Sequence, residues 1–225
     1  MTSALTAGPC PLCGLALQSP APMACVGARL YWRCVRCDLI WLTPAQRPSR
    51  EEERAEYALH ENDPDDAGYR RHLAKLTDRL SARAADGTSL MCLDFGSGPG
   101  PAIAPMMGER GACVANYDPF FAPDRSVLRP AHYDVITCTE VAEHFHDPAA
   151  SFAQLAALVK PGGSLGVMTR LHDHAGCAFA RWYYVQERSH VVFYSTSTMR
   201  WIADRFGWQV RLAPPDVAIF ETPLA

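Results

Sequence analysis

The sequence of 225 residues contains no apolar run that approaches the roughly 20 residues a helix needs to cross a bilayer. The first ten residues, MTSALTAGPC, lack the basic start and the long apolar core of a secretory signal. Positive charge is not in excess, since the net charge is −3, and this argues against a large nucleic-acid-binding surface. We therefore expect a cytoplasmic protein that binds neither a membrane nor nucleic acid.

The composition is that of a globular protein, with 48% hydrophobic and 20% charged residues. The length allows one catalytic domain and a small appendage. Charge is unevenly distributed, because residues 1–50 contain five arginines and one acid, whereas residues 51–66 contain eight acids and one arginine. Charge runs of this kind are typical of solvated faces.

Four of the nine cysteines form two close pairs, CPLC and CVRC, with twenty residues between them (Cys10, Cys13, Cys34 and Cys37). Two C-x2-C knuckles supply the four thiolates that Zn²⁺ prefers in a tetrahedral site. Disulfides or a redox pair are alternative interpretations, but nothing indicates secretion and the motif occurs twice. We predict a structural zinc with all four ligands from protein. Cys25, which lies between the knuckles, is not expected to be a ligand.

Three parts of the chain differ in pattern. Residues 1–45 are predicted to form a zinc-ribbon-like module. Residues 46–87 are predicted to form a polar connector with one short acidic helix, followed by a lead-in helix with leucines on one face. Residues 88–225 alternate short apolar runs with helical patterns, which is typical of an α/β sheet.

The fold class expected for residues 88–225 is a Rossmann-like, doubly wound, mostly parallel sheet. Its end differs from that of dinucleotide-binding folds, because WQVRLA, PPD and VAIFET predict an antiparallel hairpin at the C-terminus. Strands are predicted at 89–95, 112–118, 133–139 and 164–170, and helices at about 101–110, 148–159 and 196–206.

A glycine-rich turn, CLDFGSGPG, follows the first of these strands at 92–100. A dinucleotide-binding loop would have a third glycine where Pro101 stands, and a P-loop would need a following lysine, which is absent. The motif that does match is D-x-G-x-G-x-G, formed by Asp94, Gly96, Gly98 and Gly100. Glycines of this kind let the backbone approach a ligand closely.

In this motif the chain resembles the class I S-adenosylmethionine (SAM)-dependent methyltransferases. The resemblance implies SAM as cofactor, with an acid at the end of the second strand that accepts the ribose hydroxyls. Asp118 stands at that place, although it could instead start a turn, and Asp94 could instead cap the following helix. The cofactor-binding residues implied are Asp94, Gly96, Ser97, Gly98, Gly100, Asp118, Pro119 and Glu140.

A third block, YDVITCTEVAEHFHDP at 133–148, matches the segment of this family that often carries a Glu-His pair, and KPGG at 160–163 matches the turn before the next strand. One departure is the short gap between Asp118 and Asp134. It is too short and too rich in proline for the usual helix, strand and helix. A third strand is therefore expected to be absent or rudimentary, and only candidates for the adenine wall can be named, which are Phe120, Phe121 and Asp124.

Methyl transfer needs a general base only when the acceptor holds its proton tightly. The candidate catalytic residues are Glu143, His144 and His190, and further possible bases are His146, His172, Asp173 and His174. Structural roles are the alternative for each of them. The aromatic segment FARWYYV at 179–185 is the candidate acceptor lid, unless its rings belong to the core.

The sequence thus predicts a SAM-dependent methyltransferase with a small-molecule acceptor and a zinc ribbon that shapes the acceptor site. Its catalytic half is similar to quinone-biosynthesis O-methyltransferases, and zinc-bearing sugar C-methyltransferases offer an analogy for the whole. One alternative is an RNA base methyltransferase that docks RNA on the ribbon. Another is a non-catalytic zinc adaptor with a vestigial SAM site.

Overall fold

The centre of the computed structural model, which describes residues 7–17, 19, 21–59, 62–81, 89–173 and 176–224, is a six-stranded sheet of order β5-β4-β6-β7-β10-β9. Neighbours among β4 to β7 are parallel, whereas β10 runs antiparallel to both β7 and β9. This confirms the doubly wound sheet with a C-terminal hairpin. The strands are β4 (Met91–Phe95), β5 (Cys113–Tyr117), β6 (Tyr133–Thr139), β7 (Val159–Met168), β9 (Gln209–Ala213) and β10 (Val217–Glu221).

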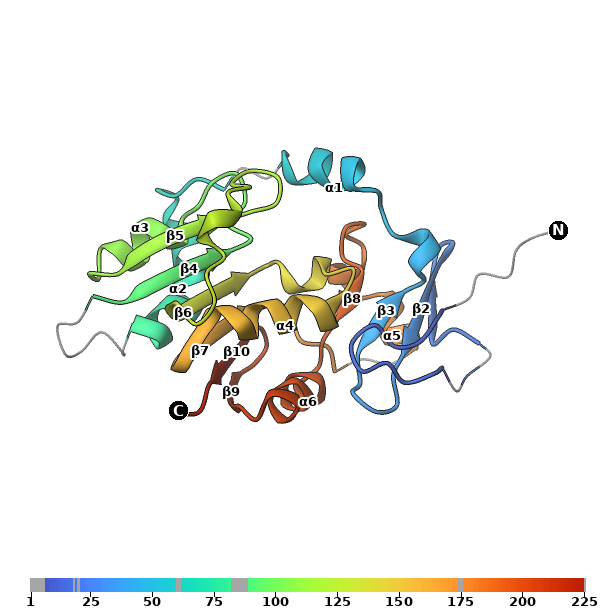
Figure 1. Ribbon diagram of the computed structural model, residues 1–225. Coiled ribbons are helices and arrows are strands. Elements are labelled where there is room, and N and C mark those ends of the chain that lie inside the picture. Colours follow the sequence, from blue (N-terminus) through green and yellow to red (C-terminus); the bar gives the residue numbers. More distant parts are fainter. Residues whose placement is uncertain are drawn as a thin grey trace.

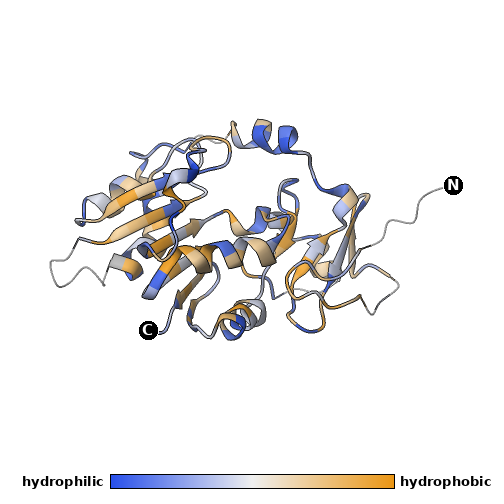
Figure 2. Cartoon of the chain, viewed as in Figure 1, coloured by the Kyte–Doolittle hydropathy of each residue, from blue (hydrophilic) through white to orange (hydrophobic). Residues whose placement is uncertain are grey.

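Helices cover both faces of this sheet (Figure 1). On one face lie α2 (Ala67–Ser81) and α3 (Ile103–Gly108), and on the other lie α4 (Pro148–Leu158) and α6 (Thr196–Phe206). The leucines of α2 face the sheet as predicted, and a Cβ on Gly166 of β7 would lie 2.7 Å from Leu80. Figure 2 shows the resulting pattern of apolar strands between helices with hydrophilic outer faces.

The KPGG segment differs from its prediction. It forms part of β7, where the pairing with β6 shifts register between Tyr133 and Val135, and Gly162 has a φ of +71°. The segment is therefore an irregular bulge inside the strand and not a turn before it.

The shortened segment after β5 contains a single 3-10 turn, Arg125–Val127, and no strand among its described residues. The strand β5 consequently forms one edge of the sheet. The expected loss of the third strand is confirmed.

A second sheet joins the N-terminal ribbon to the rest of the chain. It has the order β1-β2-β3-β8, where β1 (Ala24–Val26), β2 (Arg29–Arg33) and β3 (Ile40–Leu42) come from the ribbon and β8 (Val192–Phe193) follows the segment after β7. The pairing of β3 with β8 is antiparallel. Phe179, in the short helix α5 (Cys177–Ala180), packs edge-on against Tyr31 and Phe193 across this junction. The ribbon and the catalytic sheet therefore share one hydrophobic core.

Candidate active site

A cavity of about 860 Å³ lies at the carboxyl ends of β4, β5 and β6, which is where open α/β sheets bind ligands. Two groups of predicted residues line it. The cofactor group contributes Gly96, Ser97, Gly98, Asp118, Pro119 and Glu140, and the catalytic group contributes Glu143, His144 and His190. Asp94 and Gly100, also predicted to bind cofactor, lie outside this lining.

The glycine loop is tightly enclosed by neighbouring segments. Gly96 has a φ of +83°, and a Cβ there would lie 2.3 Å from the Val141 side chain. A Cβ on Gly100 would lie 1.8 Å from the backbone oxygen of Asn62. The glycines are thus required by close approach within the protein, and Gly96 and Gly98 also line the cavity.

Asp118 accepts hydrogen bonds at both of its carboxylate oxygens. Its Oδ2 accepts a hydrogen bond from the Gly98 amide at 3.0 Å, and its Oδ1 accepts from the amides of Phe120 and Phe121 at 2.8 and 3.0 Å. Asp118 therefore does start a turn, as the alternative interpretation predicted, and its carboxylate also lines the cavity. Phe120 and Phe121 line the cavity beside it, whereas Asp124 is exposed and does not.

Asp94 lies beneath the loop, 3% exposed, and accepts a hydrogen bond from the Thr137 hydroxyl at 2.8 Å. Burial raises the pKa of the Asp94 carboxyl to about 7; the Thr137 bond opposes this shift, and the charge of Asp118 adds to it. Asp94 supports the loop from below, at a place where a nearby cation would favour its charged form.

Arg50, Glu53 and Tyr57 of the acidic helix α1 (Arg50–Tyr57) line the cavity. Figure 1 shows this helix at the top of the molecule, between β5 and the ribbon strands. Ser49 and Glu52 form a capping box at its start, which explains a helix in so polar a segment. At the cofactor end, Arg50 donates to the Pro119 carbonyl at 3.0 Å and its guanidinium lies 4.7 Å from the centre of the Phe120 ring.

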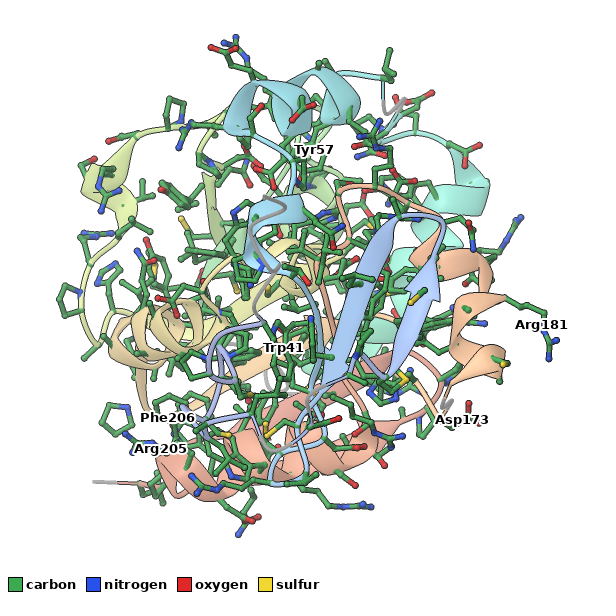
Figure 3. All side chains as sticks on the ribbon, turned by 90° about the vertical axis from the view of Figure 1, so that its right-hand side faces the viewer. Trp41, Tyr57, Asp173, Arg181, Arg205 and Phe206 are labelled. Carbon is green, nitrogen blue, oxygen red and sulfur yellow. The ribbon has the colours of Figure 1, made fainter. Side chains whose placement is uncertain are left out.

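At the other end of the cavity, Glu53 of α1 lies 2.8 Å from Nε2 of His146. The Tyr57 ring packs edge-on against His144 with centroids 5.0 Å apart, and Figure 3 shows this tyrosine beneath α1. The helix therefore contacts residues at both ends of the site. Its amino-acid sequence indicated only a short acidic helix, because charge and capping do not reveal what a helix covers.

Glu56 of α1 meets Glu187 of the segment before β8. A hydrogen bond that the protonated Glu56 carboxyl donates to the Glu187 carboxylate, helped by partial burial, raises the pKa of Glu56 to about 7. The folded protein therefore holds more protons than the unfolded chain between about pH 4.5 and 7, so this pair stabilises the fold at low pH and loses that contribution as pH rises. In Glu187→Gln, urea unfolding across this range should show a weaker fall in stability with pH than the wild type.

The matched control is Glu51→Gln, an exposed carboxylate on the same helix, which should keep the wild-type dependence. An unchanged pH dependence in Glu187→Gln would contradict the shared proton.

Glu143 is fully buried behind the cavity wall. Its Oε1 accepts a hydrogen bond from the Tyr184 hydroxyl at 2.5 Å, and the same hydroxyl lies 3.3 Å from Oε2 of Glu140. Burial, and then the charge of Glu140, raises the pKa of Glu143 well above its ordinary value. Burial behind the wall therefore disfavours the charged form of Glu143.

His144 and His190 lie beside Glu143 with their ring centroids 4.9 Å apart. Nδ1 of His144 lies 2.9 Å from the Ser189 carbonyl, and Nδ1 of His190 lies 2.8 Å from the Tyr184 carbonyl. Since a carbonyl only accepts, both Nδ1 atoms carry hydrogen. The structure thus brings the three predicted catalytic residues together.

The other candidate bases lie at different places in the structure. His146 lines the cavity. His172 is buried away from it, where its Nε2 donates to the Asp38 carbonyl of the ribbon at 3.1 Å, and Asp173 is exposed at the periphery (Figure 3). His174 lies outside the described residues.

The aromatic segment after β7 is mostly core and does not form the expected lid. Phe179 and Tyr184 are buried, and Tyr183 is 64% exposed. None of the rings of residues 179–184 lines the cavity. The segment instead supplies Tyr184 as the partner of Glu143, a role that sequence pattern does not distinguish from packing.

The four paired cysteines converge in the ribbon. Their Sγ atoms all lie within 4.8 Å of one another, with Cys10 and Cys37 at 3.6 Å and Cys13 and Cys34 at 3.4 Å. These separations are too long for disulfides. They approach the roughly 3.8 Å edge of a tetrahedron with Zn–S bonds of about 2.3 Å. The cluster therefore fits one structural zinc, and Cys25 is exposed and outside it.

Both knuckles have the same backbone turn. Gly14 donates to the Cys10 carbonyl at 2.9 Å, and Asp38 donates to the Cys34 carbonyl at 3.0 Å. Both donors have positive φ, at +70° and +63°. The Asp38 carboxylate also accepts from the Ser195 hydroxyl at 2.6 Å, at the start of α6, so the second knuckle is anchored on the catalytic part.

Residues 66–213 match a family model described as a methyltransferase domain. A ubiquinone biosynthesis O-methyltransferase of Saccharophagus degradans is 29% identical over 119 residues, which cover 48% of this chain and 50% of the relative. The corresponding protein of Pseudomonas aeruginosa is 33% identical over 88 residues, covering 39% and 38%. The chain thus spans about half or less of the length of these curated relatives.

Two solved structures are similar in fold. One is 1,6-didemethyltoxoflavin N1-methyltransferase of Burkholderia thailandensis, with a TM-score of 0.50, 14% identity and coverage of 88% of this chain and 96% of that one. The other is phosphoethanolamine N-methyltransferase 2 of Haemonchus contortus with SAM, with a TM-score of 0.51, 20% identity and coverage of 72% and 43%. Across the part of the chain that the structure describes, no helix is both long and apolar enough to span a membrane.

Proposed function

Because the chain belongs to the class I SAM-dependent methyltransferases, whose family model covers residues 66–213, we propose that it methylates a hydroxyl group of a small molecule. SAM supplies an electrophilic methyl group when bound. The close-packed glycine loop and the Asp118 carboxylate fit this cofactor, with Pro119, Phe120 and Phe121 beside its adenine end. Asp94 and Gly100 support the loop, and Ser97 and Glu140 complete the cofactor end.

The observation that carries the choice of a hydroxyl acceptor is the group of His144, His190 and Glu143 at the far end of the same cavity. A hydroxyl holds its proton tightly and needs a base, whereas a neutral amine can attack without one. An imidazole whose Nδ1 donates to a carbonyl, as in His144 and His190, can take that proton on Nε2. Similarity to O-methyltransferases over about half of their length agrees with this acceptor.

The charge around the acceptor end favours a small molecule over RNA. Glu53 and Glu187 both line this part of the cavity. Phosphodiester groups would be repelled there, and RNA-binding surfaces depend on phosphate contacts. We propose that the ribbon of residues 1–45 forms a wall that shapes this acceptor end, with residues 46–87 carrying the covering helix and residues 88–225 the SAM site.

The test is to incubate the protein with SAM and panels of hydroxylated compounds, amines and RNA, and to measure S-adenosylhomocysteine by mass spectrometry. We expect product with hydroxylated compounds, and a loss of about a hundredfold in turnover for His144→Gln at unchanged SAM affinity, as for removal of a general base. His132→Gln, at the opposite end of β6, should keep turnover.

Turnover with RNA alone, together with binding that weakens steeply as salt rises, would contradict the proposal in favour of a nucleic-acid acceptor. If none of the panels gives turnover, the alternative of a non-catalytic zinc adaptor with a vestigial SAM site is favoured.

A further inference from the structure

Most of the ionisable side chains that line the cavity are acidic. They are Glu53, Asp118, Glu140, Glu143, Asp147 and Glu187. Arg50 is the one lysine or arginine that the described residues contribute to the lining, and it is engaged at the cofactor end by the Pro119 carbonyl and the Phe120 ring. Apart from histidines, the described lining of the acceptor end therefore contains no positive side chain.

Carboxylates approach the acceptor end from two elements. Glu53 of α1 is 8% exposed, and its Oε1 lies 2.8 Å from Nε2 of His146. Glu56 lies one turn further along the same helix face, and its carboxyl shares a proton with that of Glu187 from the segment before β8. Two carboxylates repel each other unless a proton or a cation lies between them. Since Glu187 lines the cavity, a cationic group that enters can take the place of that proton.

The buried carboxyl of Glu143 is an independent observation that points to a ligand. Its Oε1 accepts from the Tyr184 hydroxyl, whereas its Oε2 has no hydrogen-bond partner among the described residues, although the side chain is 0% exposed and lines the cavity. A buried oxygen without a partner is costly unless a ligand donates to it. A positive donor would also favour the charged form of Glu143, which burial disfavours.

The Tyr57 ring supplies an aromatic surface beside these acids. It packs edge-on against the rings of His144 and Phe120, with centroids 5.0 and 5.8 Å away, and it lines the cavity. Burial, and then the charges of Glu53 and Glu143, raise the pKa of Tyr57, so its hydroxyl lies within electrostatic reach of both acids. An aromatic ring next to carboxylates is a favourable environment for an ammonium or a guanidinium group.

We infer that the acceptor carries a cationic nitrogen, as an ammonium or a guanidinium group, besides the hydroxyl that is methylated. The cationic group donates to Glu187 and to Oε2 of Glu143, beside Glu53 and the Tyr57 ring. The inference rests on the proposed function, which makes this part of the cavity the acceptor end. It excludes acceptors whose substituent at this end is a carboxylate or a phosphate, because the acids would repel such groups.

The positive charge of SAM does not account for these acids. Under the proposed function SAM lies against the glycine loop, with its cationic groups near Asp94 and Glu140. Glu53 and Glu187 belong instead to α1 and to the segment before β8. Their negative charge is therefore available to the acceptor.

Probes that share one ring and differ in charge test the inference without knowledge of the natural acceptor. The full chain is saturated with S-adenosylhomocysteine, so that the cofactor end is filled, and is titrated with benzylammonium, benzyl alcohol and benzoate. Ligand-observed nuclear magnetic resonance measures each dissociation constant. We expect benzylammonium to bind about tenfold more tightly than benzyl alcohol, as for a charge-assisted hydrogen bond, and benzoate to bind more weakly than both.

Variants of the acids locate the effect. Glu187→Gln and Glu53→Gln should each reduce the preference for benzylammonium to about threefold or less, while the affinity for benzyl alcohol stays as in the wild type. Glu51→Gln removes an exposed carboxylate of the same helix and should keep the preference of the wild type. Benzylammonium that binds no more tightly than benzyl alcohol, or not at all, would overturn the inference. So would a preference that both cavity variants retain.

Matched acceptors separate this inference from the proposed function. Glucosamine and dopamine are hydroxylated amines, and their N-acetyl derivatives are neutral. If binding shows the charge preference but no hydroxylated compound yields S-adenosylhomocysteine, the cationic site stands and the proposed function fails. If neutral hydroxylated compounds are methylated as fast as their cationic counterparts, the proposed function stands and the cationic acceptor is refuted.

Discussion

Asp118→Ala is expected to lower the affinity for SAM by about a hundredfold or more. Two hydrogen bonds from ribose hydroxyls to a carboxylate contribute about 1.5 to 3 kcal/mol each. Losing both costs about 3 kcal/mol or more, and this corresponds to a decrease in affinity of about a hundredfold or more. The same carboxylate also accepts the amides of Gly98, Phe120 and Phe121, so its removal disturbs both the glycine loop and the adenine wall. Isothermal titration calorimetry with SAM measures the loss.

Two comparisons make the result specific to the ribose. Asp124→Ala removes a carboxylate from the same segment that caps the exposed 3-10 turn and does not line the cavity, and it should leave SAM affinity unchanged. Asp118→Asn keeps one oxygen, which can still accept from the amides of Phe120 and Phe121, but it loses the negative charge and the acceptor for the Gly98 amide. It should keep the turn after β5 while binding SAM weakly. Wild-type affinity in both Asp118 variants would refute the ribose assignment.

Cys34→Ser is expected to lose zinc and nearly all turnover while SAM binding survives. The reason is a short chain of backbone hydrogen bonds between ribbon and site. Leu42 of β3 donates to the Val191 carbonyl at 2.8 Å, and the Val191 amide donates to the Glu143 carbonyl at 2.9 Å. Disorder in the ribbon therefore reaches His190 and Glu143, whereas the glycine loop lies on the other side of the cavity.

Metal analysis, SAM calorimetry and product formation should be measured on the same preparation. Cys25→Ser, an exposed cysteine of β1 outside the cluster, should keep zinc and turnover. A Cys34→Ser protein that keeps its zinc would contradict the ligand set. One that loses zinc but keeps full turnover would contradict the coupling of ribbon and acceptor end.

Features carried by short, contiguous patterns could be predicted from the sequence. The cysteine knuckles, the glycine loop before Pro101 and the leucine face of α2 each depend on residues within a few turns of one another. The missing third strand followed from length alone, because fifteen residues between Asp118 and Asp134 cannot hold two helices and a strand. These features are determined by residues close together in the sequence, and the structure contains all of them.

Features that depend on distant pairing could not be predicted. The strand β8 has only two residues and exists because β3, some 150 positions earlier, pairs with it. The aromatic segment 179–185 is predicted to be either an acceptor lid or core, and only the folded chain shows that Phe179 packs against Tyr31 of the ribbon. The partnership of Tyr184 with Glu143 likewise joins two segments that only the folded sheet brings together.

The pairing of β3 with β8 has a consequence for how such a protein can change over generations. A ribbon attached by a flexible tether could be exchanged between lineages without cost to the enzyme. Here the strand that completes the ribbon's sheet follows directly on His190, so a new ribbon must arrive with a matching acceptor segment. The ribbon and the segment that carries β8 must therefore change together, and under the proposed function this couples the ribbon to the choice of acceptor.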